Sequence, residues 1–61
     1  MSDLQPSQPA PVLSVLVAED NSLNQKIVVR MVRGLGCHVD AVANGLEVME
    51  AVRRRRYDVV L

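Results

Sequence analysis

The chain has 61 residues, and its seven Lys and Arg residues balance seven Asp and Glu residues to give zero formal net charge. A chain of this length rarely gains more than ~3–5 kcal/mol from one core, which excludes two domains and most self-contained enzymes. Neutrality and a single aromatic residue, Tyr57, argue against direct nucleic-acid binding. The hydrophobic share of 49% excludes wholesale disorder. One cysteine, Cys37, permits neither an internal disulfide nor a multi-cysteine zinc site, so we expect a reducing, cytoplasmic compartment.

The N-terminal segment holds all three prolines of the chain, separated by Ser, Gln and Ala. Each proline fixes its φ and removes a backbone donor, so residues 1–11 are predicted to form a disordered arm, either a plain terminus or an interdomain linker. The segment lacks the basic and apolar regions of a secretory signal. No segment of the chain approaches the ~20 apolar residues of a membrane-spanning helix, so no membrane contact is expected.

A nearly continuous apolar run over residues 12–18 predicts a strand that is buried on both faces, as in a parallel sheet. Ser22 and Gln25 then have the spacing of a capping box, with Ser22 as the cap of a helix. Apolar residues recur at intervals of three and four as far as Leu35, which predicts an amphipathic helix. Gly36 suits the left-handed conformation that ends such a helix.

The second half of the chain predicts a strand, a helix and the start of another strand. His38–Val42 alternates between polar and apolar residues, as expected of a strand nearer the sheet edge. Asn44 is the predicted cap of the next helix and Glu47 its third residue; Asn-Gly could also form a hairpin turn, but the apolar residues that follow have helical spacing. The arginines at 53–56 end this helix, and residues 59–61 begin the third strand.

The predicted order β-α-β-α-β indicates an α/β fold with a parallel sheet and right-handed crossovers. The most apolar strand, the first, should lie between the other two, giving the order 2-1-3 of a doubly wound sheet with one helix on each face. The third strand would then present an apolar edge, which native proteins normally cover or charge. We therefore expect residues 12–61 to form the first half of a larger domain.

Two adjacent acids, Glu19 and Asp20, follow the first strand directly. In open α/β sheets, ligands bind beyond the carboxyl ends of the strands, where the crossover direction reverses, and the order 2-1-3 places that reversal at the first strand. One or two carboxylates suit Mg²⁺, which keeps several waters. The alternative is local, because acids before a helix also favour its positive end.

Two other motifs give weaker evidence of a binding function. The glycines at 34 and 36 follow a helix and lack a third glycine, so they form no dinucleotide fingerprint. The arginines at 53–56 could bind nucleic acid or act as a localisation tract, but a solvated helix end also accounts for them.

Five motifs between Val12 and Leu61 occur together in one known family. They are Glu19-Asp20-Asn21 after the first strand, Asn24 in the helix, Leu35-Gly36 before the second strand, Ala43-Asn44-Gly45 before the second helix, and the Tyr57-Asp58-Val59-Val60-Leu61 run. In these motifs the chain resembles the N-terminal half of a response-regulator receiver domain from two-component phosphorelays. The Glu-Asp-Asn form with Asn24-Gln25 is most similar to receivers attached to hybrid histidine kinases.

The resemblance implies a five-stranded flavodoxin-like fold of order 2-1-3-4-5, present here only to the third strand. It implies that Glu19 and Asp20 hold Mg²⁺ in the intact domain, with Asp20 as the direct ligand and Glu19 often acting through water. Binding of Mg²⁺ by this fragment alone is expected to be weak or absent. The metal would neutralise a phosphoryl group passing from a phosphohistidine of a histidine kinase or histidine phosphotransfer protein to an aspartate. That acceptor is expected about two positions after Leu61. Asp58 lies at the start of the strand, ~13 Å from its carboxyl end at ~3.3 Å per residue, and cannot substitute.

These expectations leave three hypotheses. The first is a receiver fragment of a longer phosphorelay protein, whose parent could be a hybrid histidine kinase; the fragment itself would be no enzyme and would hold no catalytic residue. The second is a truncated receiver that acts only as a non-catalytic protein-interaction module. The third, a small nucleotide-binding domain, lacks a glycine-rich loop after a strand.

Overall fold

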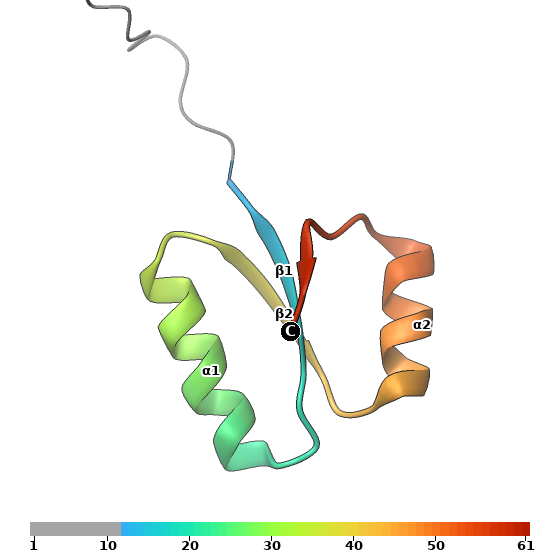
Figure 1. Ribbon diagram of the computed structural model, residues 1–61, viewed down its shortest axis with the longest axis horizontal. Helices are drawn as coiled ribbons and strands as arrows, with labels where there is room; N and C mark the ends of the chain where they lie inside the picture. The colour runs from blue at the N-terminus through green and yellow to red at the C-terminus, as the bar shows by residue number, and fades with distance from the viewer. Residues whose placement is uncertain (1–11) are drawn as a thin grey trace, which may run out of the picture.

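The computed structural model describes residues 12–61, and the predicted arm at 1–11 lies outside the described residues. Five elements follow one another along the chain (Figure 1). They are β1 (Ser14–Ala18), α1 (Ser22–Gly34), β2 (His38–Val42), α2 (Gly45–Arg54) and β3 (Val59–Val60). No helix within the described residues is long and apolar enough to cross a membrane.

The three strands form one parallel sheet in the order β2-β1-β3, which confirms the predicted 2-1-3 arrangement. Ser14 pairs with His38 at one end of the β1–β2 ladder and Ala18 with Val42 at the other. The crossover from β1 to β2 and the crossover from β2 to β3 run in opposite directions along the sheet, so α1 and α2 cover opposite faces (Figure 1). The fold is therefore an α/β, doubly wound, partial flavodoxin-like sheet.

The core forms around the central strand, because β1 is the most apolar segment of the chain. Val15, Leu16 and Val17 are at most 4% exposed, and Val39 of β2 is 6% exposed. Successive strand residues point to opposite faces, so Val15 and Val17 share one face while Leu16 occupies the other. Val28, Val29, Val32 and Cys37 pack against the Val15 and Val17 side, which is the side of α1.

The predicted cap of the first helix was wrong by one residue. Asn21, not Ser22, is the N-cap: its backbone is extended and its Oδ1 accepts a hydrogen bond from the Asn24 backbone N–H at 2.9 Å. Asn and Ser are about equally good caps, so the residue that leaves the strand with extended geometry takes the role. Ser22 becomes the first helical residue.

The other predicted helix ends are confirmed. Asn44 caps α2 by accepting from the Glu47 N–H at 2.9 Å, and the Glu47 carboxylate accepts from the Ala43 N–H at 2.6 Å. Gly36 has φ of +88°, in the left-handed region that favours glycine, and its N–H donates to the carbonyl of Arg33 in the last turn of α1.

The start of β1 and the length of β3 differ slightly from the predicted strands. β1 begins at Ser14, where the ladder with β2 starts, two residues later than predicted. Val12 and Leu13 before it are more than half exposed, although the Leu13 carbonyl already accepts from the His38 N–H. β3 spans two residues, yet the Leu61 N–H donates to the Leu16 carbonyl at 2.8 Å and extends the ladder. Among the described residues, β3 pairs only with β1, so its outer edge carries exposed apolar side chains.

Candidate functional site

The carboxyl ends of the three strands meet at one edge of the sheet. The Ala18 N–H donates to the Leu61 carbonyl at 3.0 Å, which joins the end of β1 to the end of β3. The Glu19 N–H donates to the Val42 carbonyl, also at 3.0 Å, which joins the same point to the end of β2. Glu19 and Asp20 therefore leave the sheet where all three strands end, at the crossover reversal.

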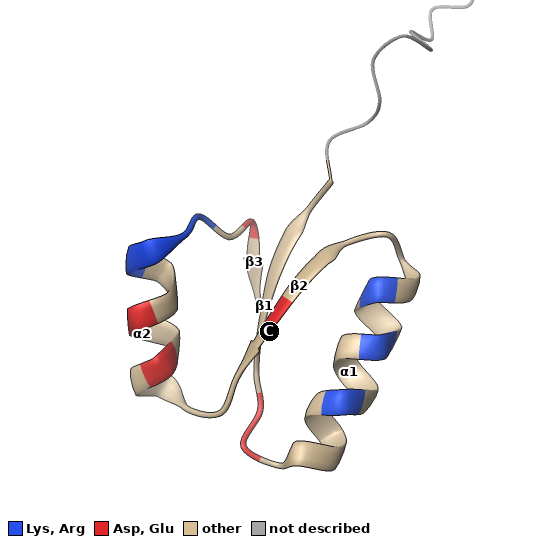
Figure 2. Cartoon of the chain, turned by 180° about the vertical axis from the view of Figure 1, so that it is seen from behind, with Lys and Arg blue, Asp and Glu red and all other residues tan. Residues whose placement is uncertain are grey.

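The two acids of this edge differ in what surrounds them. Glu19 is half-buried, and its Oε2 accepts a hydrogen bond from the Asn21 backbone N–H at 3.1 Å. Asp20 is exposed, and none of the side-chain hydrogen bonds between described residues involves it. The loop between β1 and α1 that carries both acids is the red segment at the foot of the fold in Figure 2. Within residues 12–61, the Glu19 carboxylate is thus held by the loop, while the Asp20 carboxylate is exposed to solvent.

Gln25 braces this loop from the first turn of α1. Its Nε2 donates to the Glu19 carbonyl at 3.3 Å and to the Val42 carbonyl at 3.1 Å. These bonds tie α1 to the ends of β1 and β2 just beneath the acids. The sequence prediction missed this role, because the capping-box interpretation assigned the Gln25 side chain to the start of its own helix.

The residues at this edge fit a hard cation. Carboxylate and carbonyl oxygens are the donors that Mg²⁺ prefers, and it needs only one or two carboxylates when water completes its shell. Within residues 12–61, no group of three or more His, Cys, Asp or Glu side chains gathers at one place, so a site that needs three such ligands is absent there. Glu19 and Asp20 could hold Mg²⁺ only as part of a larger, hydrated shell.

Asp58 takes no part in this site. Its Oδ2 accepts a hydrogen bond from the Ser14 backbone N–H at 2.7 Å, and its own N–H donates to the Ser14 carbonyl. Ser14 begins β1, so Asp58 lies at the amino edge of the sheet, away from Glu19 and Asp20. Asp58 is therefore held at the edge opposite to the one where the two acids emerge.

A second polar cluster, centred on Asp40, was not predicted. The Asp40 Oδ2 accepts from the Tyr57 hydroxyl at 2.6 Å and from Arg55 Nη1 at 2.9 Å, and Oδ1 lies 3.7 Å from His38 Nε2. The Tyr57 hydrogen bond, followed by Arg55, lowers the pKa of the Asp40 carboxyl below its ordinary value, although partial burial opposes the shift. The same bond raises the pKa of Tyr57 above 10.0.

Helix α1 presents an apolar surface to solvent. Leu23, Ile27 and Met31 are at least half exposed and follow one another at intervals of four, so they lie along one face. With Lys26 and Arg30 they line a hollow of about 390 Å³. Basic side chains therefore border an apolar stripe, an arrangement suited to contact with another polypeptide.

The chain is similar to short stretches of much longer proteins. It is 36% identical over 52 residues to "Hybrid signal transduction histidine kinase K" of Dictyostelium discoideum, a match that covers 85% of this chain and 4% of that protein. It is 40% identical over 47 residues to "Probable histidine kinase 1" of Oryza sativa subsp. indica, covering 77% of this chain and 5% of that protein. "Hybrid signal transduction histidine kinase B" of Dictyostelium discoideum matches at 36% over 47 residues, 2% of its length.

These matches concern a small part of each relative, because the chain spans only 2% to 5% of their lengths. No family model matches the chain, and no solved structure matches it significantly. The similarity therefore associates the described fold with proteins named histidine kinases, hybrid ones included.

Proposed function

We propose that the chain is the N-terminal half of a phosphoacceptor receiver domain, as the sequence resemblance suggests. The observation that carries the proposal is the position of Glu19 and Asp20, at the carboxyl end of a buried central strand where the crossovers reverse. Similarity to two hybrid histidine kinases of Dictyostelium supports the same assignment. The chain would then act in two-component signal transduction, with a histidine kinase or a histidine phosphotransfer protein as its partner.

The register of the sheet supports the placement of the missing acceptor. Val60 pairs with Leu16, so a strand that continued in register would bring the second residue after Leu61 opposite Glu19. An aspartate at that position would face the acidic loop across the carboxyl edge. Glu19 and Asp20 would hold Mg²⁺ there, and the bound ion would neutralise charge on the phosphoryl group. The 61 residues themselves would contribute the acidic half of the site and no acceptor.

Magnesium titration of the chain, followed by amide chemical shifts, tests this proposal. We expect the largest shifts at Glu19, Asp20 and Asn21, and we expect Asp20→Asn to abolish them. Asp58→Asn provides the control, because it removes a carboxylate from the opposite edge of the sheet. Shifts that persist in Asp20→Asn, or that vanish equally in Asp58→Asn, would contradict a magnesium site at this loop.

A second candidate function is a protein-interaction module without phosphoryl chemistry. The exposed stripe of Leu23, Ile27 and Met31, with Lys26 and Arg30 beside it, favours this candidate because it offers a partner an apolar surface with a basic border. Ile27→Glu and Asp20→Asn separate the two candidates. Binding to a histidine kinase or phosphotransfer protein that depends on Ile27 but neither on Asp20 nor on Mg²⁺ would favour the module.

A further inference from the structure

The end of α2 carries the densest positive charge of the described residues. The arginine segment, residues 53–56, supplies four of the seven basic residues in a chain of zero net charge, and all four side chains are exposed. It lies at the opposite end of the fold from the loop with Glu19 and Asp20 (Figure 2). Arg53 and Arg54 occupy the last helical turn, where positive charge favours the carbonyl end of the helix. That local role does not require four charges.

Most of this charge is uncompensated within the described residues. Arg55 is paired with Asp40 at 2.9 Å. Asp58, the nearest acid after the arginine segment in the chain, accepts from the Ser14 backbone instead. The other three arginines make no ion pair with any residue between 12 and 61. Three guanidinium groups are therefore available to carboxylates from outside the described chain.

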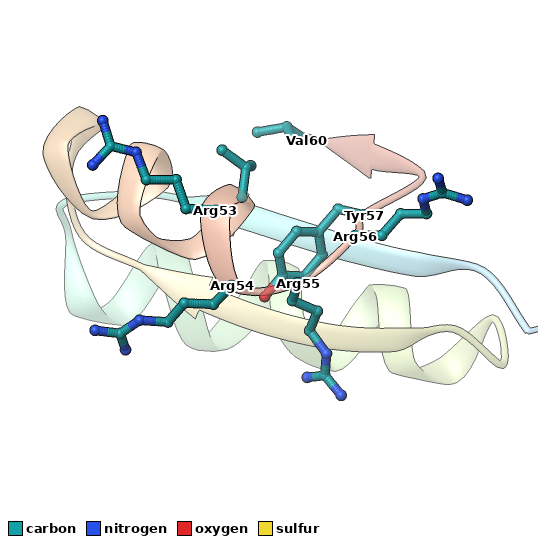
Figure 3. Close-up of a pocket in the computed structure, with 7 residues that line it drawn as sticks. Arg53, Arg54, Arg55, Arg56, Tyr57 and Val60 are labelled. Carbon is teal, nitrogen blue, oxygen red and sulfur yellow. The ribbon is translucent and has the colours of Figure 1, made fainter.

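The arginine segment borders a shallow hollow that also contains two partly exposed valines. The hollow measures about 440 Å³ and is lined by the arginine segment together with Val52, Tyr57 and Val60. Val52 and Val60 are 43% and 49% exposed. The Tyr57 ring lies at the centre, and the labelled arginine side chains point outward from it in different directions (Figure 3). Guanidinium groups that point in different directions cannot all bind one small anion. Separate carboxylates, spaced along an extended polypeptide, could each pair with one of them.

The lining of the hollow favours a peptide over a nucleic acid. Binding of single-stranded nucleic acid relies on several aromatic side chains that stack on successive bases. Tyr57 is the only aromatic residue of the chain, and its hydroxyl is held by Asp40. Val52 and Val60 offer instead a surface for an aliphatic side chain.

We propose that this surface binds an extended acidic segment of a partner polypeptide. Carboxylates of the segment pair with Arg53, Arg54 and Arg56, and an aliphatic side chain rests against Val52 and Val60. The surface lies at the opposite edge of the fold from the candidate metal site, so it does not depend on the proposed phosphoryl chemistry. It would serve to hold a partner while the carboxyl edge remains free.

A labelled peptide of Glu residues interrupted by Leu tests the charge requirement, with binding to the whole chain followed by fluorescence anisotropy. The triple variant R53Q/R54Q/R56Q should weaken binding about tenfold, the loss expected from three exposed ion pairs. Two single variants provide the matched comparison: R54Q removes one charge from the arginine segment and should weaken binding about twofold, whereas R33Q removes one charge from α1 and should leave binding unchanged. Circular dichroism confirms that all three variants keep their helices. Equal losses in R54Q and R33Q would show attraction by net charge alone and overturn the site.

Two further measurements test the hollow and the class of partner. Val60→Thr keeps the shape of an exposed side chain and should weaken the Leu-containing peptide about threefold, while an all-Glu peptide is unaffected. No difference between the two peptides would overturn the proposed contact of the aliphatic side chain with Val60. A single-stranded oligonucleotide of the same charge should bind more weakly than the peptide, and equal or tighter binding by the oligonucleotide would contradict a polypeptide partner.

Discussion

The Tyr57 hydroxyl donates to Asp40 Oδ2 at 2.6 Å, and this bond joins residues 17 positions apart in the chain. Asp40 pairs in register with Leu16 on the central strand, whereas Tyr57 belongs to the connection between α2 and β3. Since β2 and β3 flank β1, the bond links the outer strand β2 to the connection that leads into the other outer strand, on the face that contains Leu16. Arg55 strengthens the link from the same connection. The cluster therefore fastens the last crossover of the chain to the sheet.

The lowered pKa of Asp40 predicts a loss of stability in acid. A carboxyl with a depressed folded-state pKa stabilises the fold fully above its unfolded value of 3.8, and that stabilisation disappears as the pH falls through the folded value. Asp40→Asn should lower the unfolding midpoint at neutral pH and flatten its decrease in acid. Thermal unfolding of both proteins across this range measures the difference. Glu50→Gln removes an exposed acid outside the cluster and should retain the wild-type slope; equal slopes for wild type and Asp40→Asn would contradict the prediction.

Tyr57 gives the opposite sign at alkaline pH. Its raised pKa means that the protonated hydroxyl stabilises the fold, fully below the ordinary value of 10.0, and that the contribution is lost as the pH rises through the folded value. Tyr57→Phe should therefore reduce stability at neutral pH and remove this part of the alkaline decrease. Phenolate absorbance titrates the same group directly: a midpoint at or below 10.0 in the folded chain would show that the bond to Asp40 does not hold the proton.

Some of this architecture follows from sequence and some of it does not. The nearly continuous apolar run at 12–18 predicted a buried strand, and placing this most apolar strand at the centre of a right-handed parallel sheet led to the order 2-1-3 and to the edge at which Glu19 and Asp20 emerge. The cap was predicted at Ser22 and this was wrong by one residue, because Asn21 and Ser22 satisfy the same chemistry. The Asp40–Tyr57 bond leaves no periodic signal, since it depends on how two distant segments meet in three dimensions. The hydrogen bond of Gln25 to the Val42 carbonyl could not be predicted either, because it also joins segments that are distant in the sequence.

The central strand should tolerate truncation poorly. Leu16 is fully buried at 0% exposure. Leu16→Ala should lower the free energy of unfolding by about 2–5 kcal/mol, the range for a truncation that leaves a cavity where a large aliphatic side chain was buried. Because a chain this short gains only ~3–5 kcal/mol from its core, the variant should be largely unfolded by circular dichroism. Leu46→Ala, at a position that is 72% exposed, should change stability by less than about 0.5 kcal/mol. Comparable losses in both variants would place the core elsewhere.

The observed cap of α1 distinguishes two adjacent residues. Asn21→Ala should lower the free energy of unfolding by about 1 kcal/mol, because the Asn24 N–H loses its acceptor. Ser22→Ala should be neutral or slightly stabilising, since Ser22 is already helical and Ala has the higher helix propensity. Urea unfolding of the two variants decides between them. A larger loss from Ser22→Ala would restore the capping box expected from the sequence.

The proposed division of the phosphoryl site predicts a negative result for the chain alone. Asp58, the acid nearest to β3, is held at the amino edge by the Ser14 N–H, and Glu19 and Asp20 are assigned to the metal. Incubation with acetyl phosphate and Mg²⁺ should therefore leave the intact mass of the 61 residues unchanged, because no carboxylate occupies the acceptor position. A chain extended in register by a few residues, with aspartate second after Leu61, should gain one phosphoryl group that depends on Asp20. A stoichiometric adduct on the unextended chain would instead show that one of its own carboxylates accepts phosphate and would refute the division of the site.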